Sequence, residues 1–160
     1  MAVKDAYVLS TEIPSQVKGV KSLIIAGNFE ALAADDAGSK YRICRVPANA
    51  VPISIDINMD AIAGVTEADL GLYDTKEQGG AVKDIDCFQD GVDMHGGYAI
   101  GSELSGLSAM TIDEIGDQMY EFAGDDAPTP GGEYDLVLTC VSEITGTGTV
   151  AFRIVLGPSS

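Results

Sequence analysis

Residues 51–60 decide the fold class. They read Val51-Pro52-Ile53-Ser54-Ile55-Asp56-Ile57-Asn58-Met59-Asp60, with an apolar side chain at every second position. Because successive side chains of a β-strand point to opposite faces, this alternation predicts a strand with one buried and one solvated face. Such strands are typical of antiparallel sheets, and Pro52 places that position at a strand end or a sheet edge.

Two segments near the C-terminus alternate in the same way. Their expected inward faces are Tyr134, Leu136, Leu138 and Cys140, then Val150, Phe152, Ile154 and Leu156. Residues 41–46 are predicted to form a strand that ends at Pro47, and residues 69–88 a hairpin with a long loop. Several short strands separated by turn residues predict an all-β protein, an antiparallel β-sandwich or jelly roll.

One short helix is expected, over about residues 111–123. Thr111 and Glu114 have the spacing of a capping box, and Met110 and Ile115 that of a hydrophobic staple. The face of this helix that is expected to be apolar consists of Ile112, Ile115, Met119 and Phe122. Gly124 is expected to end it.

The length of 160 residues predicts a single domain. Pro14 and Gly19 interrupt short apolar pieces near the N-terminus, which indicates an extended arm followed by a first strand over residues 1–30. Residues 31–160 are expected to form the β-sandwich body. The apolar run 23–26 is too short to cross a bilayer, so no membrane insertion is expected.

The charge is strongly negative and unevenly placed. Twenty-five acids and nine bases give a net charge of -16, which argues against binding nucleic acid or an anionic membrane. Residues 1–83 carry 8 bases and 11 acids, whereas residues 84–160 carry one base and 14 acids. This bias predicts an acidic face and a nearly neutral one. The alternative is an evenly solvated surface that keeps the protein soluble.

No reactive centre is indicated, and we expect no cofactor and no enzymatic activity. The three cysteines, Cys44, Cys87 and Cys140, lack the spacing of a zinc site or a disulfide framework and are expected to be buried. His95 is the one histidine and lies in a loop-like context.

Two acidic patterns resemble cation sites. Asp56, Asn58, Asp60 and Glu67 have the spacing of a calcium loop, but Ala61 stands where that loop needs glycine, so they are expected to be a solvated strand face. Asp84, Asp86, Asp90 and Asp93 form a second carboxylate-rich stretch, which is expected to be a polar loop. The alternative is a weak cation site.

Three sets of residues resemble one known family. They are the run 41–51; the run 69–75 with Gly79-Gly80-Ala81-Val82, Asp86 and Phe88; and the run 133–139 with 148–152. These segments are similar to small head proteins of tailed bacteriophages, the decoration or capsid cement proteins. The resemblance implies a β-sandwich or jelly-roll body without catalytic residues, located on the outer surface of the virion and made in the host cytoplasm.

The partner implied is the major capsid protein, bound by a homo-oligomer around a capsid symmetry axis, so that the protein stabilises the shell. The weakly charged N-terminal portion is then expected to contact the capsid, through Tyr7, Val8, Leu9 and Ile13. Two alternatives stay open. One is another phage particle component, a head-fibre base or tail-associated protein. The other is a calcium-dependent carbohydrate-binding module.

Overall fold

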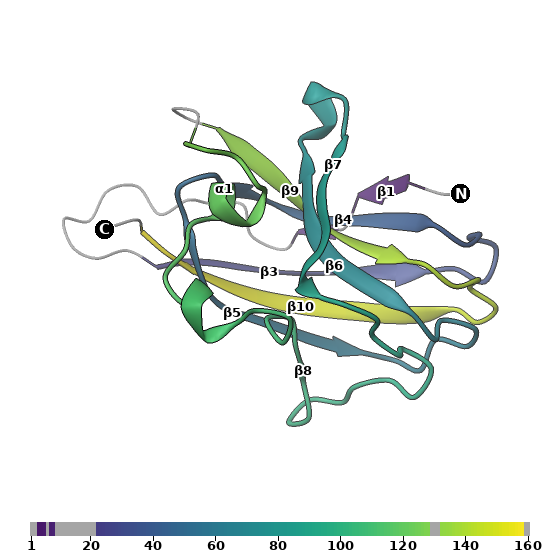
Figure 1. Cartoon of the computed structure of the whole chain (residues 1–160). Helices are drawn as coiled ribbons and strands as arrows, with labels where there is room; N and C mark the ends of the chain where they lie inside the picture. The colour runs from purple at the N-terminus through teal and green to yellow at the C-terminus, as the bar shows by residue number, and fades with distance from the viewer. Residues whose placement is uncertain (1–2, 6, 9–21, 129–131, 159–160) are drawn as a thin grey trace.

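The computed structural model describes residues 3–5, 7–8, 22–128 and 132–158. In this part of the chain, ten strands form two five-stranded sheets (Figure 1). The strands are β1 Val3–Asp5, β2 Tyr7–Val8, β3 Leu23–Ala31, β4 Ser39–Pro47, β5 Val51–Met59, β6 Ala68–Asp74, β7 Val82–Gln89, β8 Leu104–Ser105, β9 Glu133–Cys140 and β10 Gly148–Gly157. Three short helical segments complete the elements: η1 Lys76–Gln78, η2 Ile112–Glu114 and α1 Met119–Phe122.

The strand order is that of a jelly roll. One sheet has the order β1-β4-β9-β6-β7 and the other β2-β3-β10-β5-β8. The strands from β3 to β10 are the eight of the jelly roll, in which the first pairs with the last and the second with the next to last. All of these pairings are antiparallel, so the predicted fold class is confirmed.

The core lies between the two sheets and is built from the alternating residues of the central strands. The inward faces expected for β9 and β10 are confirmed, since all eight of their residues are buried. The other face of β9 is buried too: Asp135, Val137 and Thr139 are at most 5% exposed. The alternation predicted that this outer face would be solvated, so the burial of its polar side chains was not predicted.

The alternation of β5 holds only from Ile55 onward. Ile53, expected to face inward, is 55% exposed, while Pro52 is buried. The register of β5 against β10 shifts at this point, because Val155 pairs with Ser54 whereas Leu156 pairs with Pro52. This bulge leaves Ile53 without a partner and turns its side chain outward.

The β6–β7 hairpin forms as expected, with η1 in its loop (Figure 1). Leu70 pairs with Gln89 and Leu72 with Asp84, so β7 has extra residues opposite Gly71. A Cβ added at Gly71 would lie 2.1 Å from the carbonyl oxygen of Asp84. Glycine is therefore required where the two backbones approach each other.

A helix is present, but it is shorter than expected. The capping box at Thr111 and Glu114 forms, yet it encloses only the 3-10 turn η2, and the α-helix is the single turn α1. Gly116, with φ at +102°, interrupts the helix between them, and the expected staple is wrong because Ile115 is 73% exposed. The chain turns there because Met119 and Phe122 pack into the core, whereas Ile112 remains in solvent.

The N-terminal strands close one edge of each sheet. β1 runs parallel to β4, and β2 runs antiparallel to β3. The first body strand, β3, follows after residue 22 and extends to Ala31, one residue past the expected boundary.

Candidate functional site

The predicted contact residues fall at one sheet edge. Tyr7 and Val8 form β2, where they pair with Asn28 and Gly27 of β3. Leu9 and Ile13 lie outside the described residues. Tyr7 and Val8, the two members of this set that the structure describes, therefore add one strand to the edge of the β3-β10-β5 sheet.

An ion pair connects the N-terminal segment to the body. Nζ of Lys4 lies 2.7 Å from Oδ2 of Asp35, whose side chain is 7% exposed. The same oxygen accepts hydrogen bonds from the Tyr41 hydroxyl at 2.6 Å and from the Leu32 amide at 3.2 Å. Burial alone would raise the pKa of Asp35, but the hydrogen bonds from Lys4, Tyr41 and Leu32 lower it below its ordinary value. Asp35 is thus an ionised carboxylate held in place by the body and neutralised by Lys4.

The outer face of the β3-β10-β5 sheet is weakly charged. Its residues lie in register across the three strands. They are Ile24, Ala26, Asn28 and Glu30 of β3; Thr149, Ala151, Arg153 and Val155 of β10; and Ser54, Asp56 and Asn58 of β5. Arg153 and Asp56 neutralise each other in an ion pair of 2.9 Å. Ile24 and Ile53 are 61% and 55% exposed at one end of this surface, which we call the neutral face.

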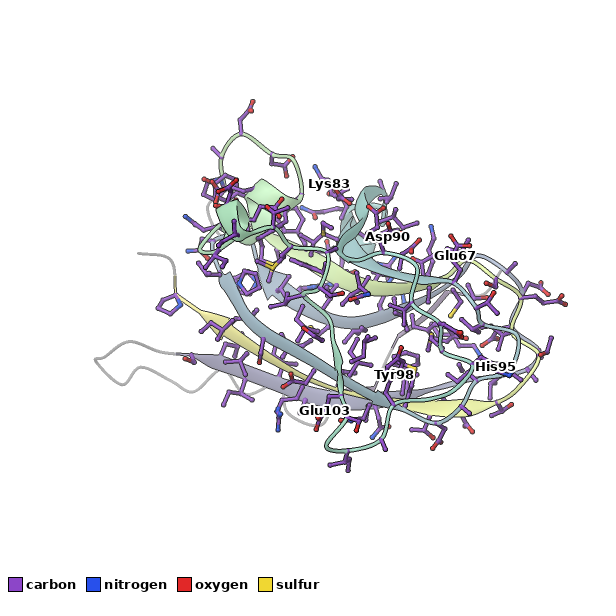
Figure 2. The ribbon with its side chains drawn as sticks, turned by 60° about the horizontal axis from the view of Figure 1, so that its bottom comes forward. Glu67, Lys83, Asp90, His95, Tyr98 and Glu103 are labelled. Carbon is purple, nitrogen blue, oxygen red and sulfur yellow. The ribbon has the colours of Figure 1, made fainter. Side chains whose placement is uncertain are left out.

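A cluster of carboxylates lies beside β7, at the other sheet. A hollow of about 400 Å³ is lined by Asp84, Asp86 and Asp90 from β7 and its end, and by Glu114, Asp117 and Glu121 from the η2–α1 region. Burial and the neighbouring Asp86 raise the pKa of Asp84. In Figure 2, Asp90 and Lys83 lie on this side of the molecule, whereas Tyr98 and Glu103 lie beside the β3-β10-β5 sheet. Six of the acids that follow residue 83 are therefore gathered around the hollow beside β7, whereas Glu103 lies near the neutral face.

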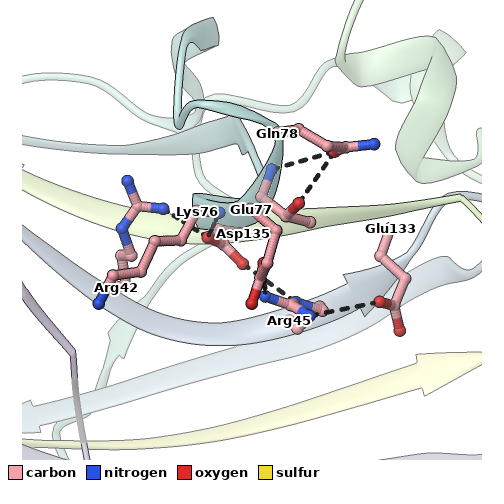
Figure 3. A network of polar contacts seen from close by, with 8 residues as sticks. Arg42, Arg45, Lys76, Glu77, Gln78, Glu133 and Asp135 are labelled. Atoms are coloured by element: carbon pink, nitrogen blue, oxygen red, sulfur yellow. Dashed lines mark hydrogen bonds and ion pairs between the residues drawn. The ribbon is translucent and has the colours of Figure 1, made fainter.

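A polar network covers the outer face of the other sheet, around Asp135 (Figure 3). Oδ2 of Asp135 lies 2.5 Å from Nη1 of Arg42 and accepts the Lys76 amide at 3.0 Å. Arg45 reaches Oδ1 of Asp135 at 3.4 Å and also pairs with Glu77. The network joins β4, β9 and η1, and so holds the β6–β7 loop against the sheet.

The groups considered for catalysis or metal binding are engaged elsewhere. His95 is exposed, and its amide donates to Asp93. Asp60 accepts the Thr149 amide, and Asn58 donates to the Ala99 carbonyl, as expected for a strand face. Among the residues that the structure describes, no group of three or more His, Cys, Asp or Glu side chains could hold a metal ion.

The cysteines are all free thiols. Cys44 and Cys140 are buried as expected, and Cys87 is half-buried. Burial raises the pKa of Cys140 to about 12, so its thiolate is scarce at neutral pH. Of the described helical segments, none has the length and apolar character needed to cross a bilayer.

Comparison with known proteins gives two similar structures. A chain in the capsid of Ralstonia phage GP4 is 14% identical, with a TM-score of 0.47 over 94% of this chain and 92% of that chain. A chain in the capsid asymmetric unit of cyanophage Pam1 is also 14% identical, with a TM-score of 0.42 over 93% of both chains. No family model and no curated protein matches the sequence. At this identity, and with TM-scores below 0.5, neither similarity determines the function.

Proposed function

We propose that this protein is a non-enzymatic structural component of a tailed-phage virion, which decorates the head by binding the shell of major capsid protein. The observation that carries the proposal is the separation of a neutral face from a concentrated acidic region. A protein that adheres to a shell in many copies needs one surface of low net charge and another that repels neighbouring particles.

The segments that resemble head decoration proteins support this proposal. They are scattered in sequence, yet β4, β9, β6 and β7 are consecutive strands of one sheet. The Asp135 network joins residues of two of the sets, Arg42 and Arg45 of the first and Asp135 of the third. It also includes the amide of Lys76, which lies in the loop between the two runs of the second set. Apart from residues 148–152, which lie in β10 of the other sheet, most of the resemblance therefore falls on one sheet.

The neutral face and β2 are the proposed contact surface for the capsid. Because β2 continues the sheet beyond β3, Tyr7 and Val8 lie at the margin of that surface. Leu9 and Ile13 are proposed to contact the capsid as well. Many modest contacts, repeated by the symmetry of the shell, then stabilise it without one tight site.

The proposal is tested by binding to undecorated heads. Ala151→Asp places a carboxylate between Asn28 and Asn58 in the middle of the neutral face. We expect this variant to lose head binding while its melting temperature stays unchanged. The matched control, Ala127→Asp, adds the same charge at an exposed position beside Asp125 and Asp126 and is expected to bind normally. Normal binding by Ala151→Asp would overturn the assignment of the neutral face.

A second measurement separates decoration from the alternative particle roles. The number of copies in a purified particle is expected to be in the hundreds for a protein that covers the shell. A dozen or fewer copies would instead favour a head-fibre base or a tail-associated protein.

Replacing Tyr7, Val8, Leu9 and Ile13 together by alanine is expected to weaken head binding at least about tenfold, which is 1.4 kcal/mol.

A further inference from the structure

The N-terminal segment and the body have opposite charge. Residues 1–22 contain three bases and two acids, whereas residues 23–160 contain six bases and 23 acids. The segment is therefore attracted to any copy of the body, its own or another.

The body offers a preformed receptor for Lys4. Asp35 is held by the Tyr41 hydroxyl and the Leu32 amide, both of which belong to the body, so its carboxylate is positioned before Lys4 arrives. Lys4, at 33% exposure, then supplies the positive charge at 2.7 Å. Nothing in this contact depends on which chain contributes the lysine.

The backbone contacts are equally independent of chain identity. β1 makes three residue pairs with β4, and β2 makes two with β3. Each is a short strand added to the edge of a sheet, and an identical strand from a second copy makes the same hydrogen bonds. Two copies that exchange these strands keep every docking contact of the single chain, and exchange of this kind is a low-cost route to association.

The connection is long enough for the exchange. Fourteen residues, 9–22, separate β2 from β3, and fully extended they span at most about 46–50 Å. A domain of 160 residues has a radius of gyration of about 15 Å, so the segment can reach the sheet edge of an adjacent copy. Docking within one chain corresponds to an effective concentration of about 1 mM, so exchange requires comparable crowding of copies.

We propose that the N-terminal segment is exchanged between copies: β1 of one chain lies along β4 of a second, and its Lys4 binds the second chain's Asp35. The partner is thus another copy of this protein, joined through its own sheet edges. This contact requires no capsid, so its test does not depend on the proposed function.

The experiment uses the whole chain in two isotopic forms. Protein labelled with nitrogen-15 is mixed with an equal amount of unlabelled protein, unfolded in guanidinium, refolded together and treated with a short amine-to-amine crosslinker. Lys4 pairs with Tyr41, the residue that follows Lys40, so the two lysines lie on paired strands in the docked arrangement and within reach of such a reagent. Lys76 and Lys83 lie in the same hairpin and provide the internal control, which is always formed within one chain.

Mass spectrometry of the crosslinked peptides gives the answer. At about 1 mM protein, where docking within a chain and between chains is about equal, we expect mixed-isotope species to make up about a quarter of the Lys4–Lys40 crosslinks, and to decline at about 10 µM. The Lys76–Lys83 crosslinks are expected to be of one isotope at both concentrations. Asp35→Asn is expected to reduce the mixed Lys4–Lys40 species and leave the control pair unchanged. The proposal is overturned if the Lys4–Lys40 crosslinks are absent, or if they are of one isotope only at about 1 mM protein. The Lys76–Lys83 crosslinks show in either case that the reagent reacted.

Discussion

The carboxylate of Asp135 and the guanidinium of Arg42 lie 2.5 Å apart on adjacent strands, 93 residues apart in sequence. Both side chains are largely buried, at 6% and 13% exposure, so their charges depend on each other rather than on water. The pair is therefore the part of the polar network most sensitive to substitution.

Asp135→Asn is expected to destabilise the protein by about 3 kcal/mol, because it removes the negative charge that lies against the buried guanidinium of Arg42. Denaturant unfolding measures this loss. Glu133→Gln, on the same strand, is the matched control: Glu133 is 45% exposed and 3.7 Å from Arg45, and its loss is expected to cost under about 1 kcal/mol. Equal losses for the two variants would contradict a special role of Asp135.

Gly71→Ala is expected to cost about 1–3 kcal/mol or more, because the new methyl group meets the backbone of Asp84 and Ile85, which cannot move without opening the hairpin. Gly96→Ala is the control, since a Cβ there meets nothing within 4 Å. Its effect is expected to stay within about 0.5 kcal/mol. A Gly71→Ala variant as stable as the wild type would show that β6 and β7 do not approach as described.

Stability is expected to fall in acid partly through Asp35. Its pKa in the folded protein is below the ordinary value of 3.8, so the folded state binds this proton less readily than the unfolded state. The stabilisation is therefore present above pH 3.8 and is lost as the pH falls through the folded pKa. Unfolding of Asp35→Asn should show a deficit in stability against wild type at neutral pH, and this deficit should shrink as the pH falls below 3.8. A deficit that is constant with pH would contradict the ion pair with Lys4.

Asp84→Asn is expected to act in the opposite direction. Burial and Asp86 raise the pKa of Asp84, so its ionised form is disfavoured in the folded state. Its contribution is most favourable in acid and declines as the pH rises through the folded pKa. The variant should therefore melt above wild type at neutral pH, and this gain should disappear in acid. A lower melting temperature at neutral pH would show that the hydrogen bond from the Asp86 amide outweighs the repulsion.

Much of the fold could be predicted because strand alternation is a local property. The inward faces of β9 and β10, the end of β4 at Pro47, the β6–β7 hairpin and the capping box at Thr111 follow from neighbouring residues alone. The errors at Ile53 and in the helix have a different origin. A bulge against β10 and the interruption at Gly116 serve the packing of distant segments, which no local pattern records.

The candidate site was less predictable than the fold. Asp135 occupies an outward position that alternation assigns to solvent, yet side chains from β4 and η1 cover it. Charge counting located the excess of acids after residue 83 but not its position in space. That position depends on where β7, η2 and α1 lie.

Side-chain period and composition alone predict an all-β sandwich with an excess of acid in its second half, because both are properties of the residues themselves and need no knowledge of their partners. The tertiary structure decided the strand order, the neutral face of β3, β10 and β5, and the partners of the buried carboxylates. Lys4 and Asp35 are 31 residues apart in sequence. The two strands that flank β10, β3 and β5, come from the first half of the chain. Such pairings depend on the packing of the whole core, since each strand must bury its apolar face against the opposite sheet while it hydrogen-bonds to its neighbours in its own sheet.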